Sequence, residues 1–431
     1  MLSAFASAFR TPDLRKKLLF TLGIIALFRL GSVVPTPGVD YQAIQRCIDT
    51  VQDNSLYGLI NLFSGGALLQ LSVFALGIMP YITASIIIQL LTVVIPRLES
   101  LRQEGQAGQA KITQYTRYLT VALAILQSTG IVALARVPGR LFQGCNEVLL
   151  VQDQNLLIIQ MIFVMTAGTA VIMWLGELIT DRGVGNGMSL LIFTSIIATF
   201  PGQLWQIWTI NGIFAFSMVL VVGIAIIAGV VFVEQAQRRI PVQYAKRMVG
   251  RRMYGGTSTY IPLKVNMAGV IPVIFASSLM FLPVLLVQLT GSQSEWALWV
   301  QQNLATGTGT WYLVLYFVLI VFFCYFYVSI TFNPVEVADN MKKYGGFIPG
   351  IRAGRPTAEY LDYVLTRLTA PGSLYLGLIA VLPVFAFGFL GVGSNFIFGG
   401  TSLLIMVGVG LDTVKQIESQ LQQRNYEGFL R

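Results

Sequence analysis

The chain has 431 residues, of which 55% are hydrophobic and 11% are charged. Soluble domains carry about 25% charged residues, so the composition excludes a soluble globular protein and indicates a chain that lies mostly in lipid. The net charge is +9 and histidine is absent, which removes the residue that most often acts as metal ligand or general base near neutral pH.

Ten membrane-spanning helices are expected, because a helix of about 20 apolar residues crosses the hydrocarbon core of a bilayer. In chain order the predicted spans are 18–35, 72–95, 115–136, 154–175, 188–206, 212–233, 266–288, 310–330, 371–390 and 396–414. An even number of spans places both termini on one side of the membrane. The expected fold class is therefore an all-α membrane protein.

The basic residues predict the orientation of these spans. Most of the 28 lysines and arginines lie in segments on one side: 1–17, 96–117, 176–187, 234–265, 331–368 and 415–431. The opposite loops hold only Arg46, Arg136 and Arg140. Because positively charged loops stay on the cytoplasmic side, both termini are predicted to be cytoplasmic.

A short apolar segment, 57–64, separates the first two spans and is too short to cross the membrane. Gly65 and Gly66 are expected to end it, since glycine breaks helices. The predicted orientation puts this segment on the outer side. There it is either an interfacial amphipathic helix or a re-entrant element buried against protein beside a pore.

The second span, 72–95, is expected to be a helix kinked at Pro80. Ile78, Ile82 and Ile86 follow one another at intervals of four residues in this span. This spacing predicts that they share one helical face.

Arg29 is the one basic residue inside a predicted span. A charge within the membrane is a candidate functional site. Arg29 lies in the outer half of its helix, so snorkelling to the interface or a structural pairing is favoured over a role in transport.

The three cysteines, Cys47, Cys145 and Cys324, are too scattered to predict a metal cluster. Cys47 and Cys145 both fall in outer loops. The sequence leaves open whether they form a disulfide.

Two cytoplasmic loops are too long to be simple linkers. The segment 238–266 mixes basic residues with tyrosines. It is either a docking surface for an acidic partner, such as RNA or an acidic protein, or ordinary cytoplasmic positive charge. In the segment 333–357, Asn333 and Pro334 predict the cap and first turn of a short helix. Four glycines then shape an exposed loop that displays Arg352 and Arg355.

Catalytic and energy-coupling motifs are absent from the sequence. It has no Walker-type phosphate loop and no G-x-S-x-G motif. The assigned spans hold no carboxylate deep in the membrane, whereas proton-coupled transporters usually need one. These observations favour a passive, gated path with no enzymatic activity. A small-solute secondary transporter is the alternative, since it also fits ten helices, and a membrane enzyme is a third, less favoured class.

Seven stretches, spread over the chain between about residues 18 and 415, share their sequence with one known family. They are NLFSGGALLQLSVFALGIMPYITASIIIQLL (61–91), KITQYTRY (111–118), WLGELITDRGVGNGMSLLIF (174–193), YAKRMVGRRMYGG (244–256), PLKVNMAGVIPVIFASS (262–278), NPVEVADNMKKYGGFIPGIRAGRPTAEY (333–360) and FGGTSLLI (398–405). Through them the chain resembles the SecY / Sec61-alpha family, whose bacterial members form the central subunit of a protein-conducting channel.

The resemblance implies an hourglass pore between two pseudo-symmetric five-helix halves, 18–206 and 207–414, with 1–17 and 415–431 as cytoplasmic ends. A ring of apolar side chains at the waist would gate ions by dewetting. The resemblance assigns that ring to Ile78, Ile82, Ile192, Ile274 and Ile405. It assigns a short re-entrant plug helix to about 57–68, with Asn61, Phe63, Ser64, Gly65 and Gly66 as its site residues.

The resemblance also implies a lateral gate, formed by the second and third helices on one side and the seventh and eighth on the other. Thr83 and Leu282 correspond to positions that face each other there. The cytoplasmic loops correspond to docking sites for the ribosome and the SecA motor, and the docking residues implied are Arg251, Arg252 and Arg352.

The function implied is translocation of unfolded secretory polypeptides and lateral release of transmembrane segments into lipid, driven by the ribosome or the SecA ATPase. No cofactor or metal is expected. Expected partners are SecE, SecG, SecA, the ribosome, signal sequences with their nascent chains and membrane lipids, with YidC and SecDF as optional partners. The expected location is a bacterial plasma membrane, with a thylakoid membrane as the alternative.

Overall fold

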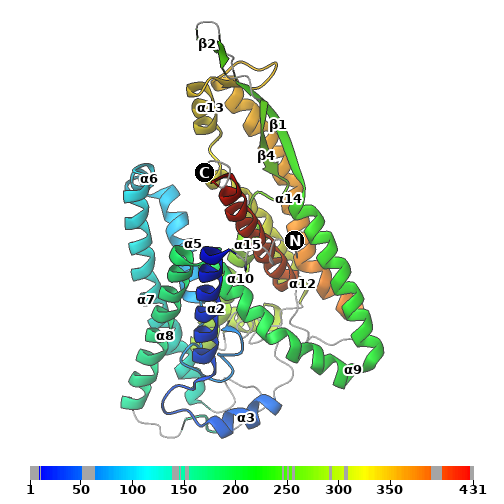
Figure 1. Ribbon diagram of the computed structural model, residues 1–431. Helices are drawn as coiled ribbons and strands as arrows, with labels where there is room; N and C mark the ends of the chain where they lie inside the picture. Colours follow the sequence, from blue (N-terminus) through cyan, green and yellow to red (C-terminus); the bar gives the residue numbers. More distant parts are fainter. Residues whose placement is uncertain are drawn as a thin grey trace.

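The computed structural model describes residues 9, 11–50, 64–137, 145, 147–150, 155–244, 247–249, 252–254, 258–290, 294–304, 309–389 and 400–427. It is a bundle of long helices with a β-hairpin projecting from one end (Figure 1). The long helices are α2 (Pro12–Val33), α5 (Met79–Val94), α7 (Gln106–Arg136), α8 (Asn155–Arg182), α9 (Gly187–Gln235), α10 (Ile271–Thr290), α12 (Thr310–Thr331), α14 (Arg355–Phe389) and α15 (Gly400–Glu427).

The ten predicted spans all fall mainly on these helices. α9 accounts for two of them, because it breaks at Gly212, where φ is 79°. By length and apolar composition, six helices in the described part of the chain qualify as membrane spans. The number is seven if α5 and the following helix α6 (Pro96–Gln103), which are bent by 99°, form one span. Several helices extend beyond the predicted boundaries, as α8 does by continuing to Arg182.

The predicted start and kink of the second span are wrong. Residues 65–71 and 73–78 form turns, and α5 begins only at Met79. The chain before it pairs with the end of α2 instead of coiling, as the backbone N–H of Val73 donates to the carbonyl of Val34 at 2.9 Å. Pro80 therefore lies in the first turn of α5, where its missing N–H costs no helical hydrogen bond.

Glycines let the backbone approach closely around this turn segment. A methyl group on Gly168 of α8 would lie 2.1 Å from the carbonyl oxygen of Val73. A methyl on Gly400, at the start of α15, would lie 1.6 Å from the carbonyl oxygen of Ile379 in α14. In lipid the hydrophobic effect does not drive helices together, so such close packing is a main source of their association.

The two long loops contain regular structure. Strands β1 (Gln237–Tyr244) and β4 (Ser258–Lys264) form an antiparallel hairpin that continues directly from α9, and the short β5 (Gly346–Phe347) pairs with β1. At the far end, β2 (Arg247–Val249) pairs with β3 (Arg252–Tyr254). The all-α description of the bundle thus needs a small sheet added to it.

Helix α13 (Pro334–Lys343) confirms the cap expected at Asn333, whose side chain accepts hydrogen bonds from Val335 N at 3.1 Å and Glu336 N at 3.4 Å. α13 packs against α14. In Figure 1, α6, α13 and the β1–β4 hairpin lie toward the top, and α3 (Tyr41–Thr50) lies at the bottom. The elements predicted to be cytoplasmic therefore share one end of the bundle.

The contacts between helices divide the bundle into two groups. α7 packs against both α5 and α8, and α12 packs against both α10 and α14, while α15 packs against α9. α10 also contacts α5 and α7. α10 therefore joins the C-terminal group (α10, α12, α14) to the N-terminal group (α5, α7, α8), and it is one of the helices to which the family resemblance assigns the lateral gate.

Candidate functional site

The five isoleucines assigned to the pore ring all belong to one large cluster of buried apolar side chains. They project from four elements: the turn before α5 and its first residues, α9, α10 and α15. Each is at most 8% exposed, and the cluster includes Ile78, Ile82, Ile192, Ile274 and Ile405. Their role as a ring stays a prediction.

The spacing argument for α5 is consistent with the structure. Ile78 is the N-cap residue of the helix, and its carbonyl accepts a hydrogen bond from Ile82 N at 3.2 Å. Ile82 and Ile86 follow on the same buried face, and all three belong to the central cluster. Ile86, whose neighbours the sequence did not indicate, therefore faces protein.

Part of the predicted plug can be placed. Asn61 and Phe63 lie outside the described residues. Ser64 is 1% exposed, and its Oγ accepts a hydrogen bond from Leu68 N at 3.1 Å. Gly65 and Gly66 have φ values of 67° and 93°, so the chain turns there as predicted.

Arg29 makes a structural pairing with this segment. Its Nη1 atom donates a hydrogen bond to the carbonyl oxygen of Gly65 at 2.8 Å. A methyl group on Gly65 would lie 2.7 Å from the same Nη1 atom and 3.1 Å from Cα of Ser195 in α9. Gly65 is thus enclosed between α2 and α9. Sequence reasoning favoured such a pairing among its options, but it had no signal that could identify a backbone carbonyl as the partner.

Thr83 lies on α5 and Leu282 on α10, one helix from each side of the predicted lateral gate. Thr83 is 6% exposed in α5, and its hydroxyl donates to the carbonyl of Met79 at 3.0 Å. Leu282 lies half-buried in α10. Because the threonine hydroxyl is satisfied within its own helix, the contact between α5 and α10 presents mainly apolar surface to whatever enters between them.

The predicted docking arginines are placed unevenly. Arg251 lies outside the described residues, and Arg252 begins β3. Arg352 is exposed in the turn between β5 and α14, and its carbonyl accepts a hydrogen bond from Thr357 Oγ1 at 2.8 Å. Arg355 forms an ion pair with Glu359 at 3.0 Å. The glycine-shaped loop therefore presents Arg352 to the solvent, as expected.

A polar cavity, which sequence reasoning missed, lies beside the two ends of α9 and the middle of α15. It has a volume of about 510 Å³ and is lined by residues that include Glu234, Lys264, Asn266 and Asp412. Asn266 Nδ2 donates to Glu234 Oε1 at 2.5 Å, and Lys264 Nζ lies 3.5 Å from Asp412 Oδ1. The sequence placed Glu234 and Asp412 at or beyond helix ends. Glu234 is in the last turn of α9, but Asp412 lies well inside α15.

A second carboxylate joins two helices of the N-terminal group. Glu177 accepts two hydrogen bonds from Arg117, from Nε and from Nη2, both at 2.8 Å. Such a bidentate pair fixes the relative position of α7 and α8. Glu177 lies within α8 and not beyond its end, because the helix continues past the predicted boundary.

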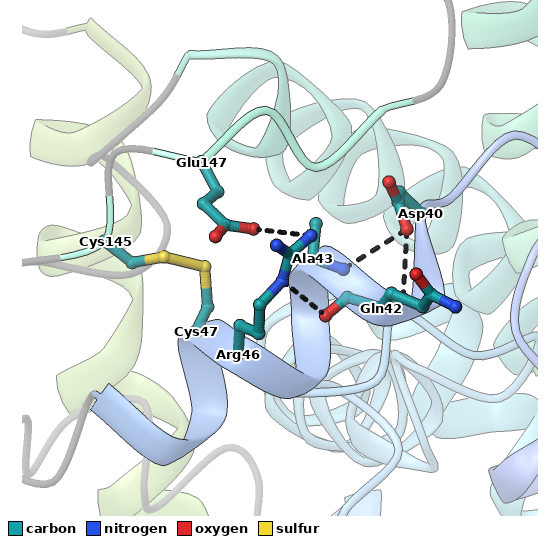
Figure 2. The surroundings of a disulfide bond; sticks show 7 residues. All are labelled: Asp40, Gln42, Ala43, Arg46, Cys47, Cys145 and Glu147. Atoms are coloured by element: carbon teal, nitrogen blue, oxygen red, sulfur yellow. Dashed lines mark hydrogen bonds and ion pairs between the residues drawn. A yellow bond between two sulfur atoms is a disulfide. The ribbon is translucent and has the colours of Figure 1, made fainter.

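On the opposite end of the bundle, the structure answers the question about the cysteines. Cys47 and Cys145 form a disulfide with their Cα atoms 5.5 Å apart (Figure 2). Nearby, Arg46 of α3 pairs with Glu147 at 3.3 Å. Asp40 caps α3 by accepting from the backbone N–H of its second and third following residues. Cys145 and Glu147 are thus tied to α3, which precedes the plug candidate.

Comparison with known proteins agrees with this geometry. A family model described as SecY matches residues 72–414. The protein translocase subunit SecY of Streptomyces scabiei is 68% identical over 438 aligned positions, covering 100% of both chains. The chain belongs to the SecY family.

Solved structures related to the SecY family share its fold. One is a SecY structure whose plug domain is described as stabilising the closed state and maintaining a membrane seal. It has a TM-score of 0.63 at 20% identity, covering 94% of this chain and 91% of the other. Sec61 in the canine ribosome–channel complex has a TM-score of 0.61 at 17% identity, with the same coverage. At these identities the likeness establishes the fold alone.

Proposed function

We propose that this SecY-family chain is the channel subunit that translocates unfolded secretory polypeptides and releases transmembrane segments laterally into lipid. The observation that carries the proposal is that the five isoleucines assigned to the pore ring, drawn from both halves of the chain, are all buried within one large apolar cluster. The relative named as a translocase subunit supports the same activity. The matched structures are protein-conducting channels, and small-solute transport is therefore not favoured.

In the proposed mechanism the apolar cluster is the closed waist of the pore. Ile82 and Ile274 would move apart when a chain enters and reseal after it leaves. Apolar side chains suit this role because a narrow apolar constriction excludes water and ions without forming bonds that a passing chain must break. The segment from Ser64, held by Arg29, would close the outer side.

Lateral release needs no catalysis. A substrate helix of about 20 apolar residues is more stable in lipid than in water, so it partitions out of the pore once a path exists. The contact of α10 with α5 and α7 is the proposed path. The chain itself supplies no driving force in this proposal, and energy comes from a docked partner.

The cytoplasmic hairpin and the loop after α13 are the proposed docking surfaces, with Arg251, Arg252 and Arg352 as contact residues. The neighbour described as Sec61 in a ribosome–channel complex supports the ribosome as one partner. SecE, SecG and the SecA motor complete the proposed assembly. We place it in a bacterial plasma membrane with both termini in the cytoplasm, on the basis of the charge asymmetry of the loops.

Site-specific crosslinking of a stalled secretory chain tests the pore path. A photo-crosslinking residue would replace Ile82 or Ile274, and in a control it would replace Phe163, which is 75% exposed on α8. We expect crosslinks to the stalled chain from both isoleucine positions and none from Phe163. Crosslinks at neither isoleucine, or equal crosslinks at all three positions, would refute the proposed path.

A further inference from the structure

A hydrogen bond joins the two helix groups at the end of the bundle that carries α6 and α13. Nη2 of Arg102, in α6, donates to the carbonyl oxygen of Ile330, at the end of α12. The two residues are 228 positions apart in the chain. Neither α6 nor α12 needs this bond in order to form as a helix. The bond is therefore a tertiary contact, which depends on how the two helix groups pack together.

The acceptor is suited to a cation. α12 ends at Thr331, so Ile330 belongs to the last turn, whose carbonyls have no partner within the helix. The helix dipole gives these carbonyls additional negative character, which favours a guanidinium near them. Arg102 therefore satisfies a carbonyl that the helix leaves open.

Arg102, the donor, belongs to a helix that packs against the N-terminal group. Leu101, the neighbour of Arg102, is buried in an apolar cluster with Ile88 of α5 and Ile112 of α7. α6 also packs directly against both of these helices. Any movement of α5 and α7 away from α10 would therefore carry Arg102 with it.

The carbonyl of Ile330, the acceptor, belongs to the C-terminal group and lies close in the chain to a proposed docking surface. α12 packs against α10 and α14. Two residues after Thr331, Asn333 caps α13, which leads into the loop that presents Arg352. A displacement of α13 would thus be passed to the Ile330 carbonyl through the short connection between Thr331 and Pro334.

We propose that Arg102 is a latch that holds the lateral gate closed from the cytoplasmic side, and that a partner docking on α13 and the 344–354 loop releases it. The proposal rests on the proposed channel function, since it assumes that α5 and α7 separate from α10. Arg102 is a positioning residue here, because it acts on the gate and does not touch the translocated chain.

The test compares Arg102→Ala with Arg97→Ala in the full channel complex. Arg97 is exposed on the same helix, and its side chain makes no hydrogen bond or ion pair within the described part of the chain. Both variants lose one positive charge from α6. Export of a precursor with a weakened signal sequence is measured in membrane vesicles, after the amounts of channel have been matched by immunoblot.

We expect Arg102→Ala to export the weakened precursor about fivefold faster than the parent, as the loss of one charge-assisted hydrogen bond allows. Arg97→Ala should stay at the parental rate. Equal rates for the two variants would overturn the latch. Failure of the parent to export even the intact precursor would instead count against the channel function itself.

A second measurement covers the case in which Arg102→Ala fails to accumulate. Cysteines would replace Arg102 and Ile330 in a Cys324→Ser background, and a short cleavable bismaleimide would join them. We expect the joined channel to lose export of the intact precursor and to recover it when the linker is cleaved. Undiminished export by the joined channel would overturn the proposal.

Discussion

The guanidinium of Arg29 lies 2.8 Å from the carbonyl oxygen of Gly65, so a charged side chain of α2 holds the first described residues of the plug candidate. In a setting of low dielectric, a hydrogen bond from a charged donor is stronger than it is in water. The same arrangement explains how the membrane tolerates this arginine. The charge is directed at a backbone acceptor inside the protein and not at lipid.

Replacing Arg29 should loosen this closure. For Arg29→Met we expect the resting ion conductance of the channel to rise about fivefold, because a net contribution of about 1 kcal/mol from the bond is lost. Conductance of purified channel complex in planar bilayers measures the effect. Leu30→Met, at a 66% exposed neighbouring position, is the control and should leave the conductance unchanged. If the resting conductance of the Arg29→Met channel equals that of the parent, the bond does not contribute to closing the channel.

Alanine substitutions at Gly65 and at Gly66 distinguish the effect of close packing around a residue from the effect of its backbone conformation. Both have positive φ, so alanine costs about 1 kcal/mol of conformational energy at either site. Only at Gly65 would the new methyl meet Arg29 and Ser195, whereas at Gly66 it meets nothing within 4 Å. We expect Gly65→Ala to raise resting conductance well above Gly66→Ala in the same bilayer assay. Equal leaks from the two variants would contradict the close enclosure of Gly65.

The disulfide between Cys47 and Cys145 should be detectable without a structure. The bond closes a loop with a sequence separation of 98 residues, which predicts a stabilisation of about 5 kcal/mol in the chain-entropy account. We expect the purified chain to migrate faster under non-reducing electrophoresis than after reduction. Cys47→Ser should abolish the shift and lower the thermal unfolding temperature, while Cys324→Ser should keep the shift. An unreduced sample without any shift would mean that the bond does not form.

Reversal of charge at Arg352 tests the docking loop. For Arg352→Glu we expect motor-driven export to fall at least about tenfold, because an exposed arginine that meets an acidic partner is replaced by a like charge. Arg355→Glu is the control, since Arg355 is already paired with Glu359 on α14. Vesicle export assays at matched channel content measure both variants. Normal export by Arg352→Glu would remove Arg352 from the docking site.

The sequence by itself determined the membrane class, the approximate positions of the predicted spans apart from the start of the second, the cap at Asn333 and the shared face of Ile78, Ile82 and Ile86. These features depend on the composition and spacing of residues that are close together in the sequence. Family resemblance added residues such as Ile274 and Ile405, which local spacing does not single out.

Only the tertiary structure decided the features that join distant parts of the chain. The pairing of Arg29 with Gly65, the disulfide and the contact of Arg102 with Ile330 each depend on which segments pack side by side. Two of these contacts use backbone carbonyls, which every residue carries and which therefore leave no mark in the sequence. The late start of α5 at Met79 has the same origin, because pairing with the end of α2 outweighs the helical preference of an apolar segment.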